Sequence, residues 1–231
     1  MSRNRSTNTK LIVFEIDDTV LKGNFIDSCA GKFVFDEEIS RLKSTEKDPV
    51  VLIKAIAKLF CGLDKGDLIK VLYNIPLVED AGQVIKKLKE HGHIVGMLTN
   101  GFQFVAHHIK NKFGLDFAIG NRLHFFNETA TGEITIPAYY YYHGGNKCNH
   151  NYCKTNALVC VAENYGISIS DCIAIGSGKN DCCIIEQSGT GVAFCSKDSS
   201  LVNAAHRSIT KPSFEELLQD GYFIKKRPSP G

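Results

Sequence analysis

The sequence predicts an α/β protein with a Rossmann-like core, a mostly parallel sheet and a small helical cap inserted after the first strand. Short apolar runs typical of buried strands alternate with segments whose apolar residues recur at helical spacing. This alternation favours a parallel sheet with right-handed crossovers. Residues 25–72, after the first apolar run, show helical spacing without a strand signal, so we interpret them as an insertion.

The first half of the chain begins with a buried strand at residues 11–16, an apolar run that ends in an acidic cluster. Helices follow within 25–72, where Gly62 ends one of them. A short amphipathic helix around 84–88 stops at His91-Gly92, and a second buried strand is expected at 93–98.

The second half continues the alternation. A helix is expected at 102–113, and a hairpin at 123–136 with its turn near Thr131-Gly132. The remaining elements are a helix at 154–165, a strand at 171–176, a helix at 181–187, a strand at 192–195 and a short helix at 214–218.

These elements divide the chain into three parts. Residues 1–20 and 77–225 are expected to form the Rossmann-like core, residues 21–76 the helical cap, and residues 226–231 a frayed tail.

Composition narrows the functional classes. The 231 residues are 43% hydrophobic and 23% charged, which is typical of a globular protein and excludes collagen, coiled coil and disorder. A net charge of +2 predicts neither nucleic-acid nor membrane binding. Nine cysteines, an odd number, without an export signal predict reduced thiols and a cytoplasmic location. Oligomeric state stays open.

Four segments carry residues typical of phosphoryl-transfer chemistry. Glu15-Ile-Asp17-Asp-Thr19 follows the first strand and Thr99-Asn100-Gly101 the second, Lys154 begins a helix, and Gly176-Ser177-Gly-Lys-Asn-Asp181 follows the third strand. An anionic nucleophile that approaches a phosphate needs cations to offset the repulsion, and hydroxyl and amide donors to hold the oxygens. These segments supply such groups.

In this order the four segments resemble those of the haloacid dehalogenase superfamily, in particular its phosphoserine phosphatase-like branch. The resemblance covers residues 11–218 and is strongest outside the motifs at residues 92–131. It implies a small phosphorylated metabolite as substrate and Mg²⁺ as cofactor.

The resemblance also implies roles for the matching residues. Glu15 stands at the position of the nucleophile that becomes a phospho-acyl intermediate, and Asp17 at that of the general acid and base. The phosphoryl oxygens would be held by Thr99, Asn100 and Gly101. Lys154 would act as a catalytic residue that balances the charge on the nucleophile and the phosphate. The magnesium positions are matched by Glu15, Asp17, Ser177 and Asp181.

Two positions depart from the family pattern. Glu15 replaces an Asp and reaches farther by roughly 1 Å, a displacement that can cost about a hundredfold in rate. Ser177 replaces a second Asp, which removes a negative charge from the cation site. The alternative to an enzyme is therefore a catalytically impaired protein that binds a phosphate ligand or a partner.

This chain also lacks two residues that bind the substrate in the phosphoserine enzymes. Asn24 stands where they carry a Glu, and residues 51–63 contain no Arg, so phosphoserine itself is doubtful as substrate. Cys148 and Cys153, directly before Lys154, instead resemble the Cys-x4-Cys-Lys segment of phosphocholine, phosphoethanolamine and pyridoxal phosphate phosphatases.

The same stretch has two further interpretations. Cys148, His150 and Cys153, with His143 nearby, are possible zinc ligands, although their spacing matches no common zinc module and an ordinary loop with reduced thiols is favoured. Residues 139–142 are four consecutive tyrosines. We expect their side chains to point alternately toward apolar groups and toward solvent, or to shape a lid over the substrate.

Overall fold

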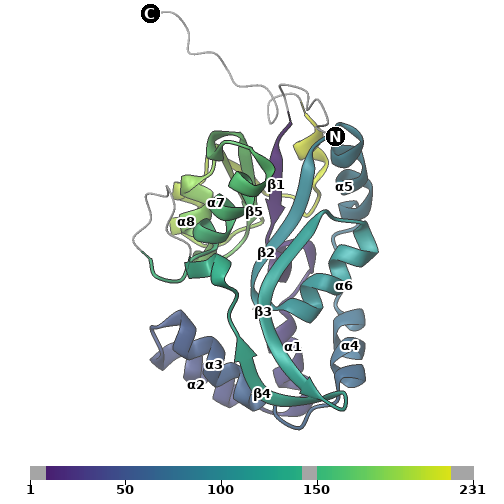
Figure 1. Cartoon of the computed structure of the whole chain (residues 1–231), viewed down its shortest axis with the longest axis vertical. Helices are drawn as coiled ribbons and strands as arrows, with labels where there is room; N and C mark the ends of the chain where they lie inside the picture. The colour runs from purple at the N-terminus through teal and green to yellow at the C-terminus, as the bar shows by residue number, and fades with distance from the viewer. Residues whose placement is uncertain (1–8, 142–149, 220–231) are drawn as a thin grey trace, which may run out of the picture.

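The computed structural model describes residues 9–141 and 150–219. Its centre is a seven-stranded sheet in the order β4-β3-β2-β1-β5-β6-β7, in which β4 alone runs antiparallel to its neighbour. The predicted fold class, a mostly parallel α/β sheet with Rossmann-like crossovers, is confirmed (Figure 1). The strands are β1 (Leu11–Phe14), β2 (Ile94–Phe102), β3 (Phe117–Phe126), β4 (Thr129–Thr135), β5 (Cys172–Gly176), β6 (Thr190–Phe194) and β7 (Arg207–Ile209).

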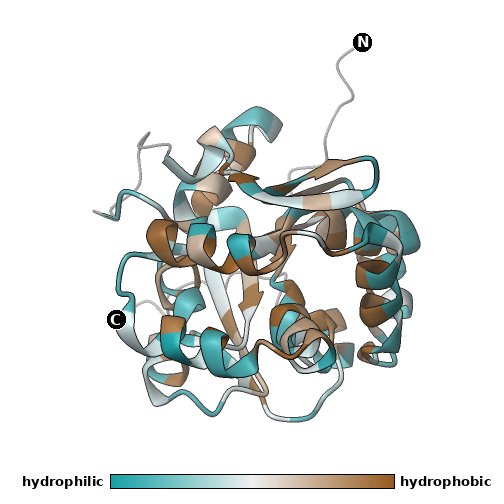
Figure 2. Cartoon of the chain, turned by 90° about the horizontal axis from the view of Figure 1, so that it is seen from below, coloured by the Kyte–Doolittle hydropathy of each residue, from teal (hydrophilic) through white to brown (hydrophobic). Residues whose placement is uncertain are grey.

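Strand β1 shows how the two faces of the sheet are covered. Ile12 and Phe14 contribute to one hydrophobic core, whereas Leu11 and Val13 contribute to another, because successive side chains of a strand point to opposite faces. Helices α5 (Ala81–Glu90) and α6 (Gln103–Phe113) pack on the first face, and α7 (Lys154–Tyr165) and α8 (Cys182–Gln187) on the second (Figure 1). Figure 2 shows the matching hydrophobic and hydrophilic sides of the helices.

Four helices fill the stretch between β1 and α5. They are α1 (Phe25–Phe33), α2 (Asp36–Thr45), α3 (Pro49–Leu59) and α4 (Lys65–Asn74), and they lie together at the end of the sheet where β4 lies (Figure 1). Asn24, Asp48 and Asp64 begin three of them by accepting backbone N–H groups. The helical content expected for this stretch is present.

The hairpin between β3 and β4 corrects one expectation. Its turn consists of Asn127 and Glu128, which have φ angles of 46° and 61°, and not of Thr131-Gly132. Two consecutive residues with positive φ form the tight turn that matches strand twist. Gly132 lies inside β4, where φ is +79° and a Cβ atom would lie 3.0 Å from Cys61 Cβ, so its function is close packing against α3.

The end of the chain was only partly predicted. Helix α9 (Ser199–Ala204) and strand β7 were missed because both are short, and the last predicted helix is a 3-10 turn at Glu215–Leu218. The predicted tail, residues 226–231, lies outside the described residues. Within the described part of the chain, every helix is too short or too polar to cross a membrane.

Candidate active site

The candidate site lies at the carboxyl ends of β1, β2 and β5, where an open parallel sheet places its ligands. A cavity of about 250 Å³ opens there between the sheet and helices α2 and α3. All of the predicted site residues line it: Glu15, Asp17, Thr99, Asn100, Gly101, Lys154, Ser177 and Asp181. Their roles remain predictions.

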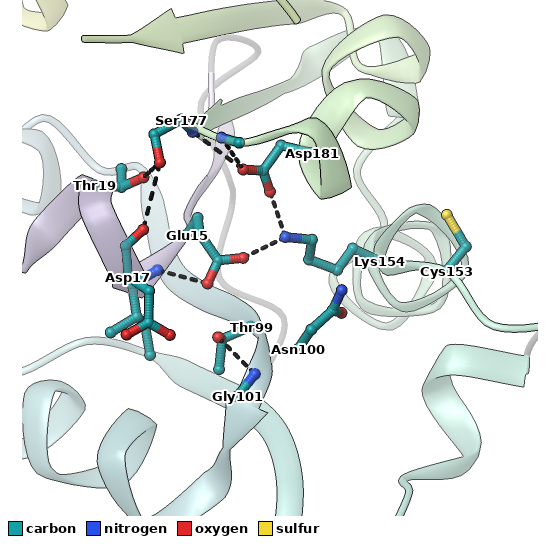
Figure 3. A network of polar contacts seen from close by, with 12 residues as sticks. Glu15, Asp17, Thr19, Thr99, Asn100, Gly101, Cys153, Lys154, Ser177 and Asp181 are labelled. Carbon is teal, nitrogen blue, oxygen red and sulfur yellow. Dashed lines mark hydrogen bonds and ion pairs between the residues drawn. The ribbon is translucent and has the colours of Figure 1, made fainter. Parts of the chain in front are cut away.

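Glu15 lies directly after β1, and its backbone N–H donates to Ile175 O at 2.9 Å, which fixes it between β1 and β5. The residue is buried, with 9% of its surface exposed. Oε1 accepts the Ile16 N–H at 2.9 Å, and Oε2 forms an ion pair with Lys154 Nζ (Figure 3). One oxygen is thus oriented by the backbone and the other by a cation.

Lys154 joins two strand ends through its ammonium group. The side chain is buried at the start of α7, and Nζ contacts both Glu15 Oε2 and Asp181 Oδ1 (Figure 3). Burial lowers the pKa of Lys154, but attraction to Asp181 and Glu15 outweighs it, so the net pKa is raised. Burial raises the pKa of Glu15, which Lys154 opposes. The ammonium therefore favours the charged form of the candidate nucleophile.

Asp181 is held by the loop that follows β5. Its Oδ2 accepts the N–H groups of Ser177 at 3.1 Å and Gly178 at 3.0 Å. A Cβ atom on Gly176 would lie 2.5 Å from Asp181 Cγ, so this approach requires glycine at the strand end. The sequence places Asp181 here because the glycines allow the backbone to wrap around its carboxylate.

Asp17 occupies the opposite wall of the pocket. Its Oδ1 accepts the Phe25 N–H at 2.7 Å, at the start of α1. Burial and the nearby charge of Glu15 raise the pKa of Asp17 to about 7, although the Phe25 hydrogen bond opposes the shift. A carboxyl group with this pKa exchanges protons near neutral pH, as a general acid and base requires.

Ser177 connects the first and fourth segments. Its hydroxyl donates to the Asp17 carbonyl at 3.4 Å and accepts a hydrogen bond of 3.0 Å from the Thr19 hydroxyl (Figure 3). Glu15, the Asp17 carbonyl, Ser177 and Asp181 therefore present oxygen ligands of the kind that Mg²⁺ prefers. They fit a magnesium ion by donor type, but with Lys154 paired to both carboxylates their net charge is only about −1.

Several residues of the site were not found from the sequence. The Tyr152 hydroxyl donates to Asn100 Oδ1 at 3.3 Å, and Asn121 Nδ2 donates to Asn100 O at 2.7 Å. The buried Tyr140 hydroxyl donates to Thr99 O, while Tyr139 and Tyr141 are exposed, as the alternation predicted. Tyr142, His143 and Cys148 lie outside the described residues. The missed residues contact the Thr99–Gly101 segment at the end of β2, and no local motif marks them.

The wall formed by α1, α2 and α3 is mainly apolar. We call the side chains of this wall the roof. We call the eight predicted site residues at the strand ends, Glu15 to Asp181 as given above, the floor. Lys43, the cation of the roof, pairs with Asp27 at 2.5 Å. The roof consists of Asn24, Ile26, Lys43, Pro49, Leu52, Ile53 and Ile56.

Comparison with known proteins shows which families and relatives this chain resembles. The profile of haloacid dehalogenase-like hydrolases matches residues 147–215. Phosphoserine phosphatase of Archaeoglobus fulgidus is 31% identical over 90% of this chain, and that of Methanocaldococcus jannaschii 29% identical over 91%. The chain spans 58% of the first relative's length and 96% of the second's.

Solved structures extend the comparison to three dimensions. A phospho-aspartyl intermediate analogue of phosphoserine phosphatase superposes with a TM-score of 0.78 at 27% identity, covering 92% of this chain and 98% of the other. A substrate-bound phosphoserine phosphatase superposes with a TM-score of 0.76 at 26% identity, again covering 92% and 98%.

These similarities place the chain in the haloacid dehalogenase superfamily, among proteins of the phosphatase type. Within this superfamily it falls in the phosphoserine phosphatase-like branch. The resemblance stated from the four sequence segments is thereby confirmed.

Proposed function

We propose that this protein is a magnesium-dependent phosphomonoesterase that acts on a small phosphorylated metabolite through a phospho-acyl intermediate on Glu15. The observation that carries the proposal is the buried bridge of Lys154 between Glu15 and Asp181, with Asp17 on the opposite side of the same cavity. A carboxylate that is desolvated yet held beside a cation is suited to nucleophilic attack on phosphorus.

In the first step, a carboxylate oxygen of Glu15 forms a bond to phosphorus while the bond from phosphorus to the leaving oxygen breaks. Asp17, protonated near its pKa of about 7, gives its proton to that oxygen. In the second step Asp17 takes a proton from water, whose oxygen bonds to phosphorus. The acyl–phosphate bond breaks, which releases phosphate and restores the Glu15 carboxylate.

The remaining floor residues hold the phosphoryl group. Lys154 offsets negative charge beside Glu15, and the Thr99 hydroxyl lies next to the Gly101 amide, which donates to it at 3.0 Å. When bound, a magnesium ion held by Glu15, the Asp17 carbonyl, Ser177 and Asp181 would supply additional charge to offset the phosphate.

We propose further that residues 21–76 act as a cap and select the substrate. Leu52, Ile53 and Ile56 present aliphatic carbons to the cavity, whereas Asn24 Oδ1 accepts the Asp27 N–H at 3.0 Å and caps α1. A zwitterionic amino acid would leave its charges against this apolar surface, at a desolvation cost. The roof therefore favours a phosphomonoester with a largely apolar organic group over phosphoserine.

The experiment is phosphate release from p-nitrophenyl phosphate and a metabolite panel, with and without Mg²⁺, beside Asp17→Asn. We expect magnesium-dependent turnover that the substitution lowers by about a hundredfold to ten-thousandfold. Equal release by both proteins, or no release from folded protein, would contradict the proposal.

A second candidate function is binding of a phosphate ligand without turnover. It is favoured by the neutral Ser177, whose hydroxyl is engaged with Thr19 and the Asp17 carbonyl. The double substitution Glu15→Asp with Ser177→Asp separates the two functions. Activity that arises only in the double variant supports a binding protein, whereas activity that falls in it supports Glu15 as the working nucleophile.

A further inference from the structure

A second group of metal-ligating side chains lies outside the floor of the pocket. His150, Cys153 and Cys183 each bring one ligand atom to within 4.8 Å of the others. Among residues 9–141 and 150–219, no other three side chains of His, Cys, Asp or Glu lie this close together. Cys153 directly precedes α7, and Cys183 is the second residue of α8. The Cys153 sulfur points away from the pocket (Figure 3).

A chain of hydrogen bonds aligns the two sulfurs. The Cys153 thiol donates to Thr155 Oγ1 at 3.3 Å, and that hydroxyl donates to Cys183 Sγ at 3.1 Å. Thr155 N also donates to Cys153 Sγ, at 3.4 Å. Both sulfurs are therefore held against the same hydroxyl group.

The backbone places His150 beside these sulfurs. Asn156 Nδ2 donates to His150 O at 3.3 Å and to Tyr140 O at 2.8 Å, and Cys153 N donates to Tyr140 O at 3.1 Å. The segment from His150 to Cys153 is thus tied at both ends to buried groups. His150 is exposed, so its ring is accessible from solvent.

We propose that His150, Cys153 and Cys183 form a binding site for Zn²⁺, with a fourth position taken by water. Bond lengths of about 2.3 Å to sulfur and about 2.0 Å to nitrogen place tetrahedral ligand atoms roughly 3.5 Å apart, so the three atoms, which lie within 4.8 Å of one another, must move closer together when the ion binds. Two thiolates balance the charge of the ion, and the neutral imidazole completes the protein ligands. Sulfur ligands select zinc over magnesium.

The site has a defined relation to the phosphoryl pocket. Cys153 precedes Lys154 in the chain, and Cys183 follows Asp181 by two residues. A zinc ion would therefore connect the two segments whose side chains form the Lys154–Asp181 ion pair. Because it binds the folded arrangement, it stabilises the protein by a free energy that rises with the logarithm of the Zn²⁺ concentration above the dissociation constant.

The test uses reduced full-length protein, Zn²⁺, and Co²⁺ as a spectroscopic substitute. We expect one Zn²⁺ per chain, a higher melting temperature with Zn²⁺, and cobalt spectra with thiolate charge-transfer and tetrahedral bands. Cys153→Ser, Cys183→Ser and His150→Ala each remove one ligand. They should bind Zn²⁺ at least about a hundredfold more weakly, since even outer groups of metal sites cost up to about that much.

Controls separate this site from other thiols and from loss of folding. Cys182→Ser removes the neighbouring thiol, which lies near Ser200 Oγ at 3.4 Å, and should bind Zn²⁺ as the wild type does. Serine at position 153 retains a side chain able to cap α7, so this variant should stay folded. Cobalt spectra without thiolate bands, or Zn²⁺ affinity unchanged in Cys153→Ser and Cys183→Ser, would overturn the proposal.

Discussion

The floor and the roof of the pocket differ in how much their partners constrain them. On the floor, the oxygens of Glu15 and Asp181 are held by an ammonium group and backbone amides, at strand ends fixed by the sheet. On the roof, Leu52 and Ile53 present methyl groups that impose no direction on a ligand. From this difference we expect the floor to determine the chemistry and the roof to select the substrate.

The largest expected contrast is between the two lysines of the pocket. Lys154→Met leaves Glu15 and Asp181 buried without their cation and should lower the free energy of unfolding by about 3–5 kcal/mol. Lys43→Met, which removes the half-exposed partner of Asp27, should cost about 1 kcal/mol or less. Urea unfolding of both variants measures the two free energies of unfolding. Equal decreases would show that the ion pairs of the floor stabilise the protein no more than that of the roof.

Next in size is the effect of the roof on substrate choice. Leu52→Ala removes aliphatic surface from the cavity and should lower kcat/KM for an alkyl phosphate by about tenfold to a hundredfold. Turnover of phosphoserine should change less. Val51→Ala is the matched control, because Val51 is exposed on the same helix and does not line the cavity. A uniform loss on both substrates would assign Leu52 to the chemical step.

Features that depend on a short stretch of sequence could be predicted, whereas features that depend on packing between distant segments could not. Helix α7 was placed at its correct bounds because residues 157–162 in its centre are apolar and Gly166 follows its end, with a φ of +64°. The floor was found because its residues lie at strand ends within short motifs. The roof could not be predicted, because it depends on how α3 is rotated against the sheet. The turn at Asn127-Glu128 was missed because it places two residues other than glycine at positive φ angles.

A smaller effect concerns the proton on Asp17. The leaving group needs the protonated form, so kcat/KM for an alkyl phosphate should fall about tenfold per pH unit above about pH 7. p-Nitrophenyl phosphate has a leaving group that needs no proton and should show a shallower decline. If kcat/KM falls equally steeply with pH for both substrates, Asp17 is not the general acid.

The smallest expected effect comes from Ser177. Ser177→Asp places a negative charge beside the Asp17 carbonyl and should tighten Mg²⁺ binding severalfold, although it removes the hydroxyl that donates to this carbonyl. Titration calorimetry with Mg²⁺ measures the change, with Ser177→Asn as the neutral control. Equal gains in both variants would attribute the effect to size and not to charge.

The backbone of the β3–β4 hairpin has a consequence for how the molecule unfolds. Gly62 N donates to Ala130 O at 2.8 Å, Ala130 N to Leu63 O at 2.9 Å, and Lys65 N to Glu128 O at 2.8 Å, so the sheet continues into the chain between α3 and α4. One hydrophobic core includes both Ile53 and Phe14. These amides should exchange with deuterium together with those of the central strands, as one cooperative unit, rather than in an earlier event confined to the helices.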